Sequence, residues 1–257
     1  DSRDRPVHRF WRMALVTALC VGVVPMQAPG RAATEPQASG SFAQRLQTAL
    51  NSGSEQGIEA VVAPELLPTL ARRYQAFRND FSGLNWAVQP AAPLADGRST
   101  FVVTVIGDTT AQGLSYQLQS EERLAIRTDA GRLVAQDVIS QESLLRSGKR
   151  PLQVTMGIPD VVLTGSRYDI DLIVDEPLGQ AMLAGGLIEL TDQQLATLSR
   201  PNLQLAPLGG GGLFKSVQAP QRPGSQTWAL MLVHPDGVVT ATKRVQIVST
   251  FNDQAQI

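Results

Sequence analysis

Side chains that could act as acids, bases or nucleophiles are few in this 257-residue sequence. It has two histidines, His8 and His234, and a single cysteine, Cys20. His8 and Cys20 fall in an N-terminal segment with the pattern of an export signal, so His234 is left alone. Because a general base needs a positioned partner, and His234 stands beside a Pro-Asp-Gly turn, we interpret it as a solvated turn residue. A histidine-rich zinc site is excluded, no Gly-x-Ser-x-Gly motif occurs, and we expect no catalytic residues.

A run of four glycines precedes two apolar residues in the second half of the chain. The segment reads Gly209-Gly210-Gly211-Gly212-Leu213-Phe214. A phosphate-binding loop needs a lysine directly after its last glycine and then a helix, but here two residues intervene and a strand pattern follows. The glycines form either a flexible connection between strands or a mobile loop that presents Leu213 and Phe214 to a protein partner. We take this segment as the candidate partner-binding site.

Acidic residues recur at alternate positions of the segment 169–175. Asp169, Asp171 and Asp175 are interleaved with apolar residues, and Glu176 follows. Calcium takes oxygen ligands from a turning loop, whereas carboxylates with a period of two are typical of the solvent face of a strand. We therefore expect no metal at these acids and no cofactor elsewhere in the chain.

Four aromatic residues and one acid in the first half form the candidate ligand-binding site. They are Tyr74, Trp86, Phe101, Tyr116 and Glu122. The aromatic side chains either fill the core, as close-packed interiors favour, or line an apolar pocket between a helix and a curved sheet. Glu122 shares a strand face with Tyr116, so its carboxyl either reaches water at the end of the sheet or faces a cavity with a raised pKa.

The first 32 residues have the three parts of a secretory signal peptide. Four arginines precede an apolar run over residues 13–24, and a small-residue segment follows. The run is short for a membrane span, so we expect cleavage near Ala32, the alternative being a retained anchor. Cleavage removes five arginines and two aspartates, which leaves a mildly acidic chain. We expect export to the periplasm, the thylakoid lumen or the extracellular space, with no nucleic-acid binding and no stable membrane insertion.

The periodicity of apolar residues predicts helices first and strands afterwards. After a linker at 33–40, helices are predicted over 41–53, 54–62 and 64–81, and strands over 85–89, 100–106, 114–127 and 132–139. The polar segment 147–151 ends this pattern, and seven or eight short strands follow, with Trp228 in their core. The expected division is therefore a domain at 41–147, a second at 148–250 and a tail at 251–257.

The first half resembles the nuclear-transport-factor-2-like superfamily in the order of its elements. The resemblance rests on Leu66–Phe81 as the long helix, on Asn85–Val88, and on strands with Phe101, Leu118–Ile126 and Leu133–Ile139. It implies a cone-shaped domain of helix and curved antiparallel sheet. The seven or eight later strands indicate an all-β immunoglobulin-like sandwich after the cone, so the expected fold class is α+β. In enzymes of that superfamily a buried Asp or His inside the cone acts as the base, and this half of the chain has no histidine there.

A second resemblance concerns the block Ile158–Asp169, which is similar to a family of exported cyanobacterial proteins. It implies the cell envelope or the thylakoid lumen. Because catalytic residues are missing, we expect a non-catalytic exported protein of two domains that binds a protein partner. The alternative is a small apolar ligand binder, or a weak lyase or isomerase, that uses the cone. A third hypothesis, glycan binding by the sandwich, rests on Trp228 and Phe214.

Overall fold

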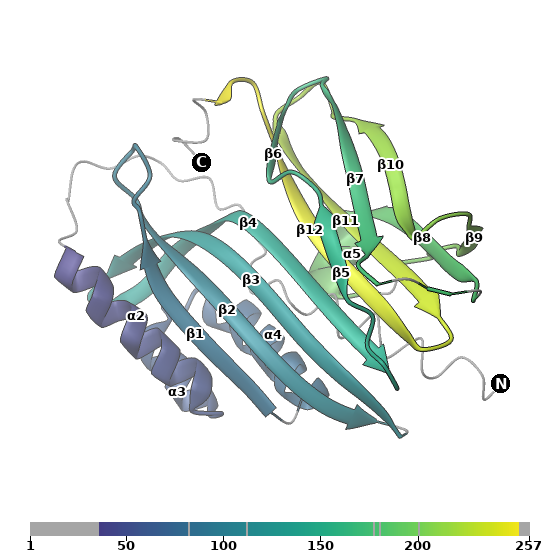
Figure 1. The fold of residues 1–257 in the computed structure, drawn as a ribbon. Helices are drawn as coiled ribbons and strands as arrows, with labels where there is room; N and C mark the ends of the chain where they lie inside the picture. Colours follow the sequence, from purple (N-terminus) through teal and green to yellow (C-terminus); the bar gives the residue numbers. More distant parts are fainter. Residues whose placement is uncertain are drawn as a thin grey trace.

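The computed structural model describes residues 36–251, apart from positions 82, 112, 177, 180 and 200. The predicted signal peptide at 1–32 lies outside the described residues, as does most of the predicted tail. Within the described part, no helix is both long and apolar enough to cross a membrane. This part is mostly β, with two sheets and a few short helices (Figure 1).

The main sheet takes strands from both halves of the chain. Eight strands lie in the order β1-β2-β3-β4-β12-β11-β8-β9, and every neighbouring pair is antiparallel. A ninth, β6, pairs in parallel with the end of β12. The strands of this sheet are β1 (Gly83–Ala91), β2 (Ser99–Ala111), β3 (Leu114–Asp129), β4 (Arg132–Gly148), β6 (Val161–Leu163), β8 (Leu183–Leu190), β9 (Ala206–Leu208), β11 (Gly224–His234) and β12 (Gly237–Val248).

The expected fold class, an α+β cone followed by a separate immunoglobulin-like sandwich, is wrong. β4 is not the edge of a first-domain sheet, because its residues 141–148 pair with residues 237–244 of β12. The sheet therefore runs from the first half into the second without closing into a cone. The apolar pattern of β4 indicates a strand, but it carries no information about a partner far along the chain. The sequence for this reason suggested two separate units.

A smaller sheet covers one face of the main sheet in the second half of the chain. Its order is β10-β7-β5, and its strands are β10 (Gly212–Gln218), β7 (Arg167–Val174) and β5 (Val154–Gly157). The alternation predicted for β7 is confirmed, since the side chains of Tyr168, Ile170, Leu172 and Val174 are buried. They form one apolar core with side chains of β11 and β12.

Trp228 lies in this core, as predicted, and it joins the two layers. Its Nε1 donates to the hydroxyl of Tyr168 at 2.8 Å, and that hydroxyl donates to Oε1 of Gln226 at 2.8 Å. All three side chains are buried. Each polar atom along this chain of hydrogen bonds therefore has the partner that a buried group requires.

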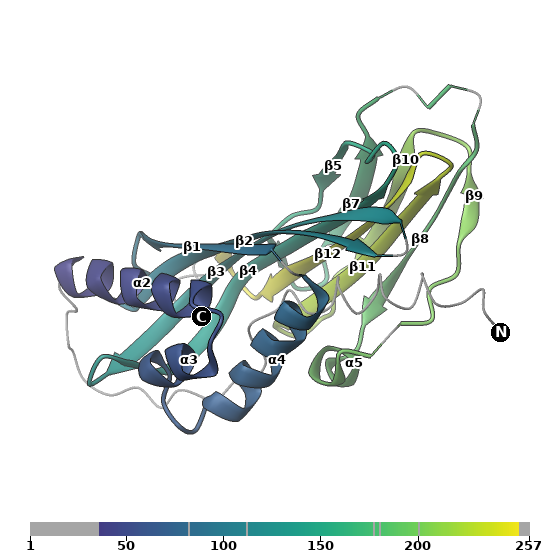
Figure 2. The ribbon, with the colours of Figure 1, turned by 90° about the horizontal axis from the view of Figure 1, so that it is seen from below.

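Helices lie on the opposite side of the main sheet from the smaller sheet (Figure 2). They are α2 (Pro36–Asn51), α3 (Glu55–Val61), α4 (Leu67–Asp80) and α5 (Asp192–Thr197). The three predicted helices are confirmed with shifted ends, and α2 begins within the stretch expected as a linker. From the sequence alone, residues 192–200 could form either a helical turn or a loop. In the structure α5 begins at a capping box made by Thr191 and Gln194. α5 packs beside α4, where the buried Arg73 donates to the carbonyl of Leu195 at 3.3 Å.

Two large apolar cores and a small third cluster of Leu190, Ala229 and Met231 lie against the one main sheet. The buried side chains of the first come from residues 42–145 and those of the second from residues 152–247. Each half of the chain therefore has an interior of its own although the two halves share a sheet. The predicted domain boundary after residue 147 falls between the two cores and stays a prediction.

A buried lysine ties the halves together where β4 meets β12. Nζ of Lys243, on β12, lies 2.9 Å from Oε2 of Glu142 on β4 and 2.5 Å from Oδ1 of Asp160, which precedes β6. Burial alone would lower the pKa of Lys243, but the hydrogen bonds and negative charges of Asp160 and Glu142 raise it above its ordinary value. The ammonium therefore stays charged at neutral pH.

Candidate functional site

The aromatic residues of the predicted ligand site fill the first core. Tyr74, Trp86, Phe101 and Tyr116 are each only 1% exposed. Trp86 packs edge-to-face on Phe77 with ring centres 5.4 Å apart. The apolar cavity beside Tyr74 has a volume of about 30 Å³, which is close to the space that one water molecule takes up in the liquid. The structure thus places these side chains together as a packed interior, with no room for a small-molecule ligand among them.

Glu122 lies on the same face as Tyr116, as predicted, and is buried at 2% exposure. Glu122 has an interaction partner in the structure, so it is not a free residue. The sequence did not reveal that it belongs to a row of buried polar side chains that crosses β3, β4 and β12. The other members are Ser120, Gln141, Ser143 and Thr242. The hydroxyls of Ser143 and Thr242 are 2.6 Å apart, so this row joins β4 to β12.

Residues 209–211 form a connection between β9 and β10, which is one of the two predicted alternatives, and both apolar residues lie in β10 and not in a loop. Gly212 opens β10, where an added Cβ would lie 2.5 Å from the carbonyl oxygen of Leu172. Leu213 is 5% exposed and packs in the second core, so its predicted role as a loop-tip contact is wrong. Phe214 points the other way and is 59% exposed. Of the two predicted apolar contacts, Phe214 alone is available to a partner.

The edge of the main sheet at β1 is closed by side chains of α2. Asn51 donates to the carbonyl of Trp86 at 2.8 Å and accepts from its N–H at 2.9 Å, and Gln47 accepts from the N–H of Val88 at 2.9 Å. Two residues further along the same edge, Pro90 has no N–H to offer. Edge strands that stay free of partners are commonly blocked in such ways.

β10 is an edge strand that lacks this protection. It is the outer strand of the smaller sheet, and Phe214, Lys215, Ser216 and Gln218 are all exposed. In the part of the chain that the structure describes, no helix or strand pairs with its outer side. The other edge strands of the second half are shorter, since β5 has four residues and β9 has three, whereas β10 has seven. The longest open edge therefore carries the exposed phenylalanine.

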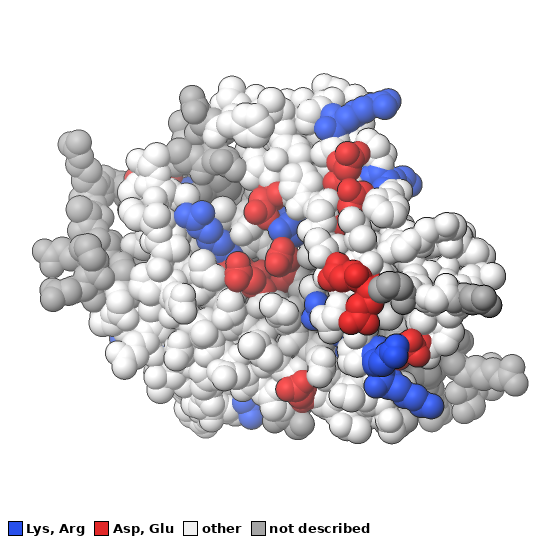
Figure 3. Space-filling view, in the orientation of Figure 1, with Lys and Arg blue, Asp and Glu red and all other residues white. Residues whose placement is uncertain are grey.

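Acidic side chains gather on the face where the smaller sheet lies (Figure 3). Asp169 is exposed and Asp171 half-buried on the outer face of β7, and Asp175 and Glu176 are exposed at its end. The prediction that Asp169, Asp171 and Asp175 face solvent is confirmed for Asp169 and Asp175. Among the described residues, no group of three histidine, cysteine or acidic side chains is arranged to hold a metal ion.

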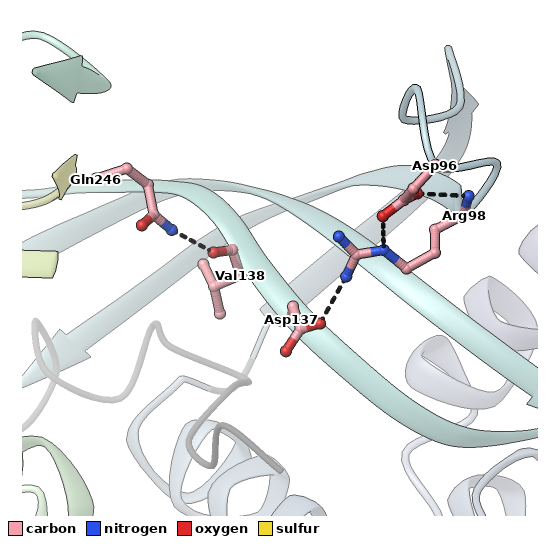
Figure 4. A network of polar contacts seen from close by, with 5 residues as sticks. All are labelled: Asp96, Arg98, Asp137, Val138 and Gln246. Carbon is pink, nitrogen blue, oxygen red and sulfur yellow. Dashed lines mark hydrogen bonds and ion pairs between the residues drawn. The ribbon is translucent and has the colours of Figure 1, made fainter. Parts of the chain in front are cut away.

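Asp137, an acid of the first half, forms an ion pair with Arg98. Its Oδ2 accepts from Nη1 of Arg98 at 2.8 Å, and Nε of Arg98 donates to Asp96 at 2.6 Å (Figure 4). Beside it, the buried Nε2 of Gln246 on β12 donates to the carbonyl of Val138 at 2.8 Å. These contacts hold β4 against its neighbours, so they position strands.

His234 is the last residue of β11 and is buried, so its interpretation as a solvated turn residue is wrong. Its Nδ1 accepts from the N–H of Asp236 at 3.2 Å, and within the described part of the chain Nε2 has no hydrogen-bond partner. It lines a pocket of about 200 Å³ together with Arg150 and Glu176. Oδ2 of Asp236 is 3.7 Å from Nδ1, too far for a hydrogen bond.

Comparison with known proteins concerns the second half of the chain. Residues 149–248 match the model of a domain of unknown function (DUF8623). This match spans β5 to β12 and leaves out β1–β4 and the helices α2–α4. No curated protein matches the sequence.

Proposed function

We propose that this chain is an exported, non-catalytic protein-binding module that contacts its partner through β10 and Phe214. The observation that carries this proposal is the exposed ring of Phe214 on the open edge of the smaller sheet. The export signal expected at 1–32 is the reason for placing that partner outside the cytoplasm.

Two further observations support a binding role for this strand. The edge at β1 is blocked by Asn51, Gln47 and Pro90, so the fold protects this edge and leaves the edge at β10 open. The aromatic side chains of the first half are packed and buried, so a ligand site there has no geometric support. An apolar ring in water next to unpaired main-chain groups is the arrangement that protein-binding sheet edges share.

The test is affinity capture from an extract of the host with the mature protein immobilised. Three forms are compared: the wild type, Phe214→Ser and Phe251→Ser. Phe251 is a matched control because it is also 59% exposed but lies outside the sheets. We expect a partner that the wild type and Phe251→Ser retain and that Phe214→Ser recovers at least tenfold less well. Equal recovery by all three forms, or no recovery above bare resin, would refute the proposal.

A further inference from the structure

The hydrogen bonds between β10 and β7 fix which main-chain groups of β10 face the open side. In an antiparallel pair, residues that bond the partner strand alternate with residues whose N–H and C=O point away from it. The N–H of Val174 donates to Gly211, and the N–H of Ala219 donates to Ser166, at opposite ends of the pair. Odd-numbered residues of β10 therefore bond β7, and even-numbered residues point away.

The exposed residues with this outward phase are Phe214, Ser216 and Gln218, and the first two lie in the middle of the strand. In the described part of the chain neither has a main-chain partner on the open side. Each offers one N–H and one C=O, so an incoming strand would meet four unpaired main-chain groups within three residues. We take the added strand as antiparallel, like both strand pairs of the smaller sheet, so that one of its residues bonds Phe214 and another bonds Ser216.

The outer face beside this edge determines which side chains such a strand should carry. Phe214 lies opposite Asp171 and Ser216 lies opposite Asp169. Neighbouring strands are about 4.8 Å apart, so a residue added opposite Ser216 would stand about 10 Å from Asp169, within reach of a lysine or arginine. Because Ser216 is small, it leaves the path to Asp169 uncovered. A residue added opposite Phe214 would instead contact its ring.

We infer that β10 binds an extended segment of another protein by antiparallel strand addition, and that this segment carries the pattern Lys/Arg-x-apolar. The basic residue lies opposite Ser216 and the apolar residue opposite Phe214, in that order because the added strand runs antiparallel. The inference rests on the proposed function and names the partner's chemistry and the mode of contact.

A second copy of this chain fits the same edge less well. Pairing of two β10 strands would place no basic side chain near Asp169 and Asp171, because the residues of β10 on this face are Gly212, Phe214, Ser216 and Gln218. A basic segment neutralises these acids instead. We therefore commit to a heterologous partner and treat self-association as a competing outcome.

The first test removes one outward N–H without touching the pairing with β7. Ser216→Pro does this, since the N–H of Ser216 points to the open side, where proline is tolerated in an edge strand. Ser216→Ala is the matched control, because it changes the side chain and keeps the N–H. The readout is an NMR titration of each labelled protein with a nine-residue peptide that contains Lys-Thr-Val among serines and threonines. We expect Ser216→Pro to bind at least tenfold more weakly, and Ser216→Ala to stay within twofold of the wild type.

The second test concerns charge. A peptide with Glu-Thr-Val in place of Lys-Thr-Val should bind at least tenfold more weakly, and Asp169→Asn should remove most of that difference. Equal binding of both peptides would overturn the basic residue in the pattern.

The outcomes separate this inference from the proposed function. If Phe214→Ser abolishes capture but Ser216→Pro, shown by circular dichroism to be folded, has no effect, strand addition is wrong and the binding role stands. If neither variant has an effect, both are wrong. A dimer seen by sedimentation for the wild type and lost in Ser216→Pro would assign the edge to a second copy and overturn the inference.

Discussion

Replacing Lys243 with methionine should measure how strongly the two halves are held together. Methionine keeps most of the volume of the aliphatic stem, which lies beside Trp228 in the β11–β12 pair, and removes only the charge. The lysine side chain is 7% exposed, whereas the side chains of Glu142 and Asp160 are 48% and 56% exposed. In the variant, therefore, both carboxylates can turn to water and neither is left buried.

The magnitude follows from this asymmetry. Hydrogen bonds to charged groups contribute roughly 1.5–3 kcal/mol each, but half-exposed partners are screened by solvent. We expect Lys243→Met to lower the free energy of unfolding by about 1–2 kcal/mol. The double variant Glu142→Gln, Asp160→Asn should cost more, about 3 kcal/mol, because it leaves a buried ammonium without a counter-charge. Adding Lys243→Met to that double variant should recover part of the loss.

The assay is urea unfolding of the four proteins, followed by circular dichroism and tryptophan fluorescence. The order of stability is the test: wild type above Lys243→Met, and Lys243→Met above the double carboxylate variant. A double variant as stable as Lys243→Met would show that the buried lysine does not depend on these acids, which would refute the reasoning.

The ionisation of Lys243 also predicts how the free energy of unfolding changes with pH. The pKa of Lys243 is raised in the folded protein, so its contribution to stability is complete below the ordinary lysine pKa of about 10.4 and is lost as the pH rises through the raised value. The stability difference between the wild type and Lys243→Met should therefore be constant from neutral pH to about pH 10 and shrink above it. A difference that grew with rising pH would contradict this assignment.

Three further substitutions test other parts of the fold. Asn51→Ala should cost about 1–2 kcal/mol and promote concentration-dependent aggregation seen by light scattering, because it uncovers the N–H and C=O of Trp86 on the edge of β1. Tyr168→Phe should cost about 1–3 kcal/mol in urea unfolding, because Nε1 of Trp228 and Oε1 of Gln226 then lie buried without the shared hydroxyl. Gly212→Ala should destabilise the protein by about 1–3 kcal/mol, because its Cβ would meet the carbonyl of Leu172, whereas Gly210→Ala, with open space around it, should be nearly neutral. Intact stability in the first two variants, or equal effects of the two glycine substitutions, would contradict the contacts on which these predictions rest.

Local patterns in the sequence predicted the elements well and their assembly poorly. The helices α2–α4 and the alternation of β7 follow from the spacing of apolar residues, and both are confirmed. β4 and β12 are far apart in the chain, and nothing in the sequence of either strand indicates that the other is its partner. Their apolar patterns would fit two separate sheets, one in each domain, equally well. The predicted fold class is wrong for this reason.

The assignment of the candidate site residues is limited in the same way, because it depends on strand register. The pattern of the segment after the glycines indicated a strand, but which of Leu213 and Phe214 faces the core depends on the register with β7, which the sequence does not show. The interpretation of His234 as a solvated turn residue rests on its neighbours Pro235 and Asp236, which indicate a turn, and it is wrong. The alternation of Trp228, Leu230 and Leu232 places His234 on the buried face, and that signal was present in the sequence.

The two halves of the chain share the main sheet, so the domain matched at residues 149–248 contains only part of that sheet. Those residues contain β12 but not β4, so a protein cut at these bounds would expose the main-chain groups of residues 237–244 along a long, largely buried strand. Such an edge pairs with whatever strand is available. Within its own bounds, therefore, the matched segment of this chain has no strand to pair with residues 237–244 of β12. In this chain β4 supplies that strand, and the whole first half serves as the support that holds it in register.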